Sequence, residues 1–143
     1  MKYVVMVLAL LVIMIPTSLL AAKKKKQGKP DGAFQLIAQL DNGKMQQVGY
    51  KNTNILFQES DQKIQAYVGC NTISGALLLK RNSMQILKLI KTDKACPDYI
   101  DGLEEQFFKH LEQVNAYDWD GSTLLLMNNK TTLMKLRRKN LKP

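Results

Sequence analysis

The sequence predicts a mainly β domain, an antiparallel sandwich or barrel, with one amphipathic helix. Two observations carry this prediction. Short apolar stretches with a period of two residues recur along the chain, and turn-forming residues separate them at intervals typical of antiparallel strands. A single segment in the C-terminal half instead repeats its apolar residues with the period of a helix. The chain has 143 residues, which fits one domain.

Residues 1–22 have the features of a secretory signal peptide. Lys2 precedes an apolar run over residues 3–15, and small residues end the segment at Ala22. The run is short for a membrane span, and Pro16 would interrupt one. Because of these features, we expect removal of this segment and a periplasmic or secreted protein. No cysteine follows the apolar run, so lipid attachment there is not expected.

A basic, flexible linker follows over residues 23–32, and it leaves a second interpretation of the N-terminus open. Basic residues tend to stay on the cytoplasmic side of a membrane, so a lysine run after the apolar segment favours an uncleaved inner-membrane anchor. The same lysines would be attracted to an anionic membrane surface by about 1 kcal/mol each. The residues of this run are Lys23, Lys24, Lys25 and Lys26.

The formal net charge of +9 is concentrated at the two ends of the chain. Only ten of the 21 basic residues lie between positions 30 and 134, together with all 12 acidic residues. The predicted globular part is therefore close to neutral, and residues 138–143 form a basic tail. Without interleaved aromatic residues or a known binding motif, the charge does not favour nucleic acid as a partner.

Alternating apolar residues predict most of the strands after the linker. In residues 63–68, for example, Ile64, Ala66 and Val68 fall on one face of a half-buried strand. Turn residues such as those at 41–44 separate the strands. The predicted strands cover residues 33–40, 54–57, 63–68, 76–80, 84–91, 116–119, 124–127 and 132–136.

Residues 100–114 form the predicted helix, because its apolar residues recur at helical spacing. Asp101 is the expected N-cap, and Glu104 three residues later completes the pattern of a capping box. The apolar side should cover an open end or face of the sheet. Its stripe consists of Leu103, Phe107, Leu111 and Val114, with Phe108 at the flank.

The sequence lacks a catalytic constellation, so no catalytic residue, metal or cofactor is expected. Its single histidine, His110, lies near the edge of the helical stripe, and we interpret it as a partly exposed surface residue. No phosphate-binding loop, dinucleotide fingerprint or nucleophile elbow occurs. Glu104 and Glu105 would point about 100° apart on a helix, so they indicate helix-start charges rather than a carboxylate pair.

Two cysteines, Cys70 and Cys96, admit two interpretations. In an exported protein the even number suggests one disulfide, whereas in a cytosolic protein the two thiols would be inert. A bridge between them would stabilise the domain by on the order of 3 kcal/mol through loop closure. The disulfide prediction therefore depends on the export prediction. Two cysteines without clustered histidines are poor evidence for a metal site.

Two motifs surround these cysteines. The first is the Gly69-Cys70-Asn71 step followed by Gly75, and the second runs from Thr92 through Cys96 into the helix. Together they resemble the META/HslJ family, which includes a heat-shock protein of exported type. The helix residues that complete the resemblance are Glu104 (or Glu105), Phe107 (or Phe108) and Leu111.

The resemblance implies a compact, antiparallel barrel-like domain with one helix over residues 33–137. The residues of the motif also have roles that follow from their own chemistry. Gly69 and Gly75 permit positive φ or the close approach of another strand. The Asn71 side chain can cap neighbouring backbone groups. A bridge from Cys70 to Cys96 could then fix this turn to the segment that enters the helix. All these roles are structural.

The leading hypothesis is a non-enzymatic, exported envelope domain with a role in stress tolerance or envelope maintenance. Its expected partner is an unidentified envelope protein or lipid, and we expect a monomer. One alternative is a carrier of a small apolar ligand such as a lipid, held in a barrel cavity that the helix gates. The other is a membrane-anchored adaptor that the lysines of residues 23–26 hold near anionic lipids.

Overall fold

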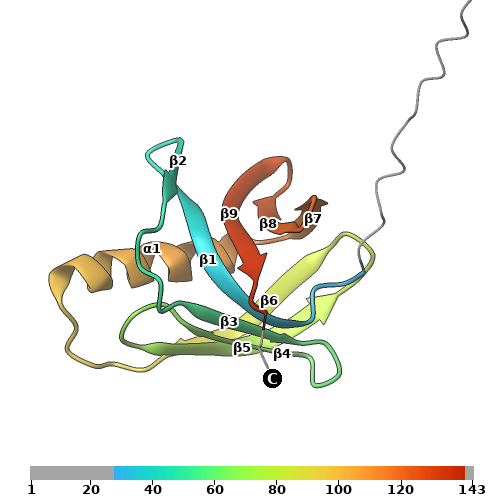
Figure 1. Cartoon of the computed structure of the whole chain (residues 1–143). Helices are drawn as coiled ribbons and strands as arrows, with labels where there is room; N and C mark the ends of the chain where they lie inside the picture. The colour runs from blue at the N-terminus through green and yellow to red at the C-terminus, as the bar shows by residue number, and fades with distance from the viewer. Residues whose placement is uncertain (1–27, 141–143) are drawn as a thin grey trace, which may run out of the picture.

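The computed structural model describes residues 28–140 (Figure 1). The predicted signal peptide or anchor, the lysines at 23–26 and the last three residues lie outside this range. The elements in chain order are β1 (Gly32–Asp41), β2 (Lys44–Gln47), β3 (Asn54–Gln58), β4 (Lys63–Tyr67), β5 (Thr72–Leu79), β6 (Met84–Lys91), α1 (Asp98–Gln113), β7 (Ala116–Asp120), β8 (Thr123–Asn128) and β9 (Thr131–Arg138).

The strands form one antiparallel sheet that curls toward a barrel. Its order is β6-β5-β4-β3-β1-β9-β8-β7. The short strand β2 pairs with the C-terminal end of β1. The two edge strands, β6 and β7, meet at one end only. There Ser83 pairs with Ala116, and the amide of Met84 donates to the carbonyl oxygen of Asn115 (3.2 Å). The predicted mainly β, barrel-like fold with one helix is therefore confirmed.

The helix α1 joins these two edges of the sheet. It follows β6 and precedes β7, and Figure 1 shows it passing behind β1. Leu111 and Phe107 on its inner side are fully buried in the hydrophobic core. The helix thus covers an opening of the curled sheet, as its apolar stripe predicted. Within residues 28–140 no helix combines the length and hydropathy needed to cross a bilayer.

The helix begins earlier than the sequence predicted, and the predicted N-cap is wrong. It starts at Asp98 after Pro97, and no side chain caps it. The carbonyl oxygen of Pro97 instead accepts hydrogen bonds from the amides of Ile100 and Asp101, at 2.9 and 3.0 Å. Asp101 therefore lies inside the first turn, where the helix dipole still favours its carboxylate.

Two strands also differ from their predicted extents. The strand β5 starts at Thr72 rather than residue 76, because Thr72, Ile73 and Ser74 pair with β4. The short strand β2 was not predicted, since its one-sided pairing with β1 leaves most of it exposed and without an apolar alternation.

Both ends of the described chain contact the domain. The indole nitrogen of Trp119 donates to the carbonyl oxygen of Gly28 (3.0 Å), and Lys29 forms an ion pair with Glu59. At the other end, β9 extends to Arg138, which we had assigned to the basic tail. Its guanidinium lies 4.8 Å from the ring centroid of Phe34 and donates to a backbone carbonyl near the start of β1. Arg138 is therefore part of the packed structure.

Candidate functional site

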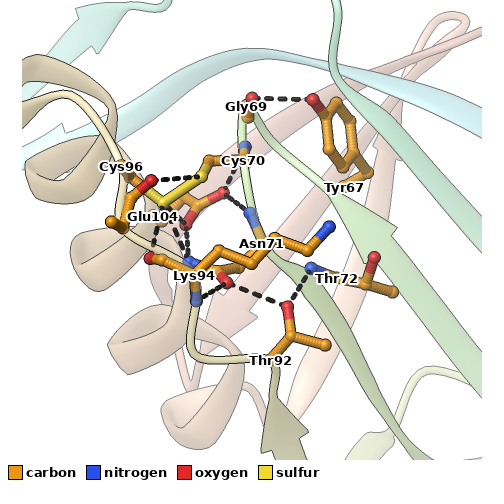
Figure 2. The surroundings of a disulfide bond; sticks show 10 residues. Tyr67, Gly69, Cys70, Asn71, Thr72, Thr92, Lys94, Cys96 and Glu104 are labelled. Carbon is orange, nitrogen blue, oxygen red and sulfur yellow. Dashed lines mark hydrogen bonds between the residues drawn. A yellow bond between two sulfur atoms is a disulfide. The ribbon is translucent and has the colours of Figure 1, made fainter.

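The two sequence motifs meet where the turn after β4, the segment before the helix and the first part of α1 converge (Figure 2). Cys70 and Cys96 form a disulfide there, with their Cα atoms 6.0 Å apart. Asn71, Thr92 and Glu104 surround the bridge. We refer to these five residues as the cysteine junction.

Glu104 occupies the centre of the cysteine junction and is fully buried. One carboxyl oxygen accepts hydrogen bonds from the backbone amides of Cys70 (2.7 Å) and Asn71 (2.6 Å). The other accepts one from the side-chain amide of Asn71 (2.9 Å). The predicted capping-box role of Glu104 is therefore wrong, because the helix starts too early for it and the carboxyl group points into the β4–β5 turn (Figure 2).

Asn71 uses its whole hydrogen-bonding capacity within the cysteine junction. Its side-chain nitrogen donates to Glu104 and to the sulfur of Cys96 (3.1 Å). Its side-chain oxygen accepts from the hydroxyl of Thr92 (2.8 Å) and from the backbone amide of Lys94 (2.9 Å). The Thr92 oxygen in turn accepts from the amide of Thr72 (3.0 Å). Asn71 thus ties three chain segments together, which extends its expected role as a cap of local backbone groups.

Gly69 lets the helix approach this turn. A Cβ atom at this position would lie 2.6 Å from a side-chain carbon of Ile100, so any other residue would force Ile100 to shift. The hydroxyl of Tyr67 donates to the carbonyl oxygen of Gly69 (2.7 Å) and holds the turn from the other side. Gly75 is needed for a different reason, since a Cβ there would lie 3.0 Å from the carbonyl oxygen of Leu87 on β6.

The reactive and hydrogen-bonding groups of the cysteine junction already have partners within the domain. Cys96, Asp101 and Glu104 offer ligand atoms within 4.8 Å of one another, an arrangement that could suit a metal ion. The Cys96 sulfur is bonded to Cys70, however, and both carboxyl oxygens of Glu104 already accept hydrogen bonds. Among the described residues, this cluster therefore supports a structural role better than metal binding or catalysis.

The single histidine lies inside the structure, so its assignment to the surface is wrong. His110 is 8% exposed, and its Nδ1 atom has no hydrogen-bond partner among the described residues. Burial lowers its pKa below the usual 6.5, because it disfavours the charged imidazolium, and the nearby carboxylate of Asp41 only partly opposes this effect. The reason for the error is that its face of the helix lies against the sheet.

Sequence reasoning missed a polar seam between β1 and the helix. The side-chain nitrogen of Gln39, which is 3% exposed, donates to the side-chain oxygen of Gln106 (3.0 Å). Gln106 in turn donates to the carbonyl oxygen of Leu40 (2.6 Å). Gln106 lies two residues after Glu104 on the helix, and no motif distinguishes it. The spacing of residues along the helix could have predicted the burial of Glu104 and His110, because these polar residues lie in phase with the apolar stripe. It does not predict the role of Gln106.

The comparisons with known proteins bear on the whole domain. The family model described as META domain matches residues 30–140. An NMR structure of a protein from Burkholderia xenovorans aligns with a TM-score of 0.58 and 19% identity, covering 76% of this chain and 82% of that chain. A crystal structure of a DUF4847 family protein from Bacteroides vulgatus aligns with a TM-score of 0.48 and 22% identity. The alignment covers 63% of this chain and 61% of that chain. The first structure has a similar fold, whereas the TM-score of the second is too low to establish a shared fold. No curated protein matches the chain.

Replacing Glu104 by Gln should destabilise the domain much more than the same change at the adjacent Glu105. The Glu104→Gln variant turns one acceptor toward the Asn71 amide into a donor, which leaves buried N–H groups unpaired at a cost of about 1–3 kcal/mol. Glu105 is 51% exposed and pairs only with surface lysines, so Glu105→Gln should cost less than about 1 kcal/mol. Urea unfolding of the oxidised proteins measures both values. Equal losses would contradict the assigned role of Glu104.

Acidification should weaken the domain through His110. Since the folded-state pKa of His110 lies below 6.5, the unfolded state binds more protons than the folded state as pH falls below that value. The free energy of unfolding should therefore be highest above pH 6.5 and fall as pH decreases toward the folded-state pKa. A His110→Gln variant should show a flatter profile in urea titrations over this window. Identical slopes for the two proteins would show that His110 does not titrate as inferred.

Proposed function

Because the chain belongs to the META domain family, we propose that it is a non-catalytic, exported domain of the cell envelope. Its role would lie in stress tolerance or envelope maintenance through contacts with protein or lipid. The disulfide between Cys70 and Cys96 is the observation that carries this proposal.

The disulfide supports export because such bonds persist in oxidising compartments and are rare in the cytosol. In this chain the bridge is not an isolated surface feature. It lies beside the buried carboxyl group of Glu104, which holds the amide of Cys70. The signal-like sequence of residues 1–22 points to the same compartment. A domain assembled around an oxidised pair fits the periplasm or the cell exterior.

The state of the reactive groups supports a non-catalytic role. Both cysteines are in the bridge, so neither provides a thiolate nucleophile. Burial lowers the pKa of His110, and the side chain lies on the helix face packed against the sheet, where it is 8% exposed. Glu104 and Asn71 bind backbone groups of the domain itself. Turnover of a simple ester, peptide or phosphate substrate by the purified oxidised protein would contradict this part of the proposal.

Ligand carriage receives no comparable support. The apolar residues of β5 and β6 divide between two sides of the sheet, so they do not all face the interior of the barrel. Leu77 and Ile86 are in the core, whereas Leu87 and Ile90 are exposed. Aromatic rings from β1, β3 and the helix fill the interior, with Phe34, Phe57 and Phe107 fully buried.

The intact mass of the protein from its native host tests the proposal. We expect a mass that lacks about the first 22 residues, with two thiols that react with an alkylating reagent only after reduction. A Cys70→Ser/Cys96→Ser variant serves as the matched control, because it should show no alkylation before or after reduction. A full-length mass with an intact bridge would favour the anchored form. A full-length mass with two free thiols would contradict export.

A further inference from the structure

One face of the sheet exposes most of the large apolar side chains that solvent reaches. Of the five exposed large hydrophobic residues among residues 28–140, four lie on β4, β5 and β6, the green to yellow strands of Figure 1. Leu87 is 47% exposed and Ile90 is 67% exposed, far more than core residues on the same strand. These four residues are Tyr67, Leu78, Leu87 and Ile90.

The strand register places all four on the same side of the sheet. Cross-strand partners share a face, so the row of Lys63, Ala76 and Leu87 lies beside the row of Gln65, Ser74 and Ile90. Tyr67 and Leu78 occupy the same face by the two-residue alternation along their strands. Residues of the opposite alternation, such as Ile64, Ile73 and Leu77, are buried. We call this side the outer face of β4–β6.

A bulge in β6 brings its two most exposed apolar residues to this face. Leu87 and Ile90 are three residues apart, so a regular strand would point them to opposite sides. Their partners on β5, Ala76 and Ser74, are only two residues apart, which marks an extra residue on β6. Lys88 in this bulge has a φ of 53°, an uncommon value for a lysine. The irregular backbone therefore places Ile90 on this face in the position that Leu89 would take in a regular strand, and Leu89 packs against the core instead.

The charge of the same three strands has a single sign. Residues 62–92 contain five basic residues and no acidic residue, although the chain has 12 acidic residues elsewhere. Lys91 is turned toward the helix, where it pairs with Glu105 (3.4 Å). The remaining four are exposed and have no ion-pair partner within the described part of the chain. They are Lys63, Lys80, Arg81 and Lys88.

Apolar side chains surrounded by unpaired basic ones suit an anionic, amphiphilic partner. An isolated exposed apolar residue is ordinary, but a cluster with basic residues around it is typical of surfaces that bind at a lipid interface. A second copy of this chain fits poorly, because two such faces would bring like charges together. The sign of the charge therefore favours lipid headgroups that carry phosphate.

We propose that the outer face of β4–β6 docks on the surface of an anionic lipid bilayer. Leu78, Leu87 and Ile90 would enter the interfacial region, while the lysines and Arg81 contact headgroup phosphates. The inference rests on the proposed function, and it names lipid as the partner and this face as the contact. It does not use the lysines at 23–26, which sequence analysis had associated with membranes.

An environment-sensitive fluorophore at Leu87 tests the contact directly. The oxidised full chain carries a Leu87→Cys substitution labelled with a nitrobenzoxadiazole dye, and a Gln113→Cys protein labelled on the exposed end of the helix is the positional control. With vesicles of phosphatidylcholine and phosphatidylglycerol, emission at position 87 should rise several-fold and shift to the blue. Emission at position 113 should stay unchanged. Salt at about 1 M, where the screening length is about 3 Å, should reverse the response.

Charge variants test the electrostatic part in the same labelled protein. A basic residue near an anionic surface strengthens partitioning about fivefold, so Lys63→Gln/Lys88→Gln should weaken the response at Leu87 about 25-fold. The matched control, Lys44→Gln/Lys130→Gln, removes two exposed lysines outside this face, at the start of β2 and in the turn between β8 and β9, and should leave the response unchanged.

Three results would overturn the inference. They are an unchanged signal at position 87, an equal signal at positions 87 and 113, and an equal response to vesicles without phosphatidylglycerol. Capture of an acidic protein by this face, with no response to vesicles, would assign it to a protein partner instead. Because the purified oxidised protein is used, none of these outcomes depends on export, which the intact-mass experiment tests separately.

Discussion

The buried carboxyl group of Glu104 joins the helix to the sheet at one point. Three N–H groups from Cys70 and Asn71 donate to its two oxygens. A buried carboxyl group is costly unless such partners are present, and backbone amides left without it would be costly as well. The interaction is therefore strongly selective for one position of the helix relative to the β4–β5 turn. The disulfide between Cys70 and Cys96 holds the same two segments covalently.

This constraint matters because the barrel is incomplete. The edge strands β6 and β7 pair only near Ser83 and Ala116, so the helix between them must cover the remaining opening. Contacts fix the helix at both ends. At its start Ile100 packs closely over Gly69, and just after its end the carbonyl oxygen of Asn115 accepts a hydrogen bond from the amide of Met84 on β6. The polar groups of the cysteine junction are thus occupied by contacts within the domain.

Much of the fold could be predicted from local sequence patterns, because period-two strands, turns and an apolar helical stripe depend on nearby residues. Features set by distant partners could not be predicted. The helical phase places Glu104, and not Glu105, beside the apolar stripe, but the groups that its carboxyl accepts hydrogen bonds from depend on the position of the distant β4–β5 turn. The bulge at Lys88 likewise depends on the pairing of β6 with β5. The cysteines and their neighbours were identified by a family resemblance, not by their geometry.

Native-state hydrogen exchange of the Cys70 and Asn71 amides tests this account most directly. Their hydrogens are bonded to a buried carboxyl oxygen, so they should exchange only when the whole domain unfolds. The account predicts the same opening free energy for these amides as for those in the central strands β1 and β9, and a loss of protection in Glu104→Gln. Fast exchange at Cys70 and Asn71, with β1 and β9 still protected, would show that this turn opens independently. The carboxyl group of Glu104 would then be a local feature on which the fold does not depend.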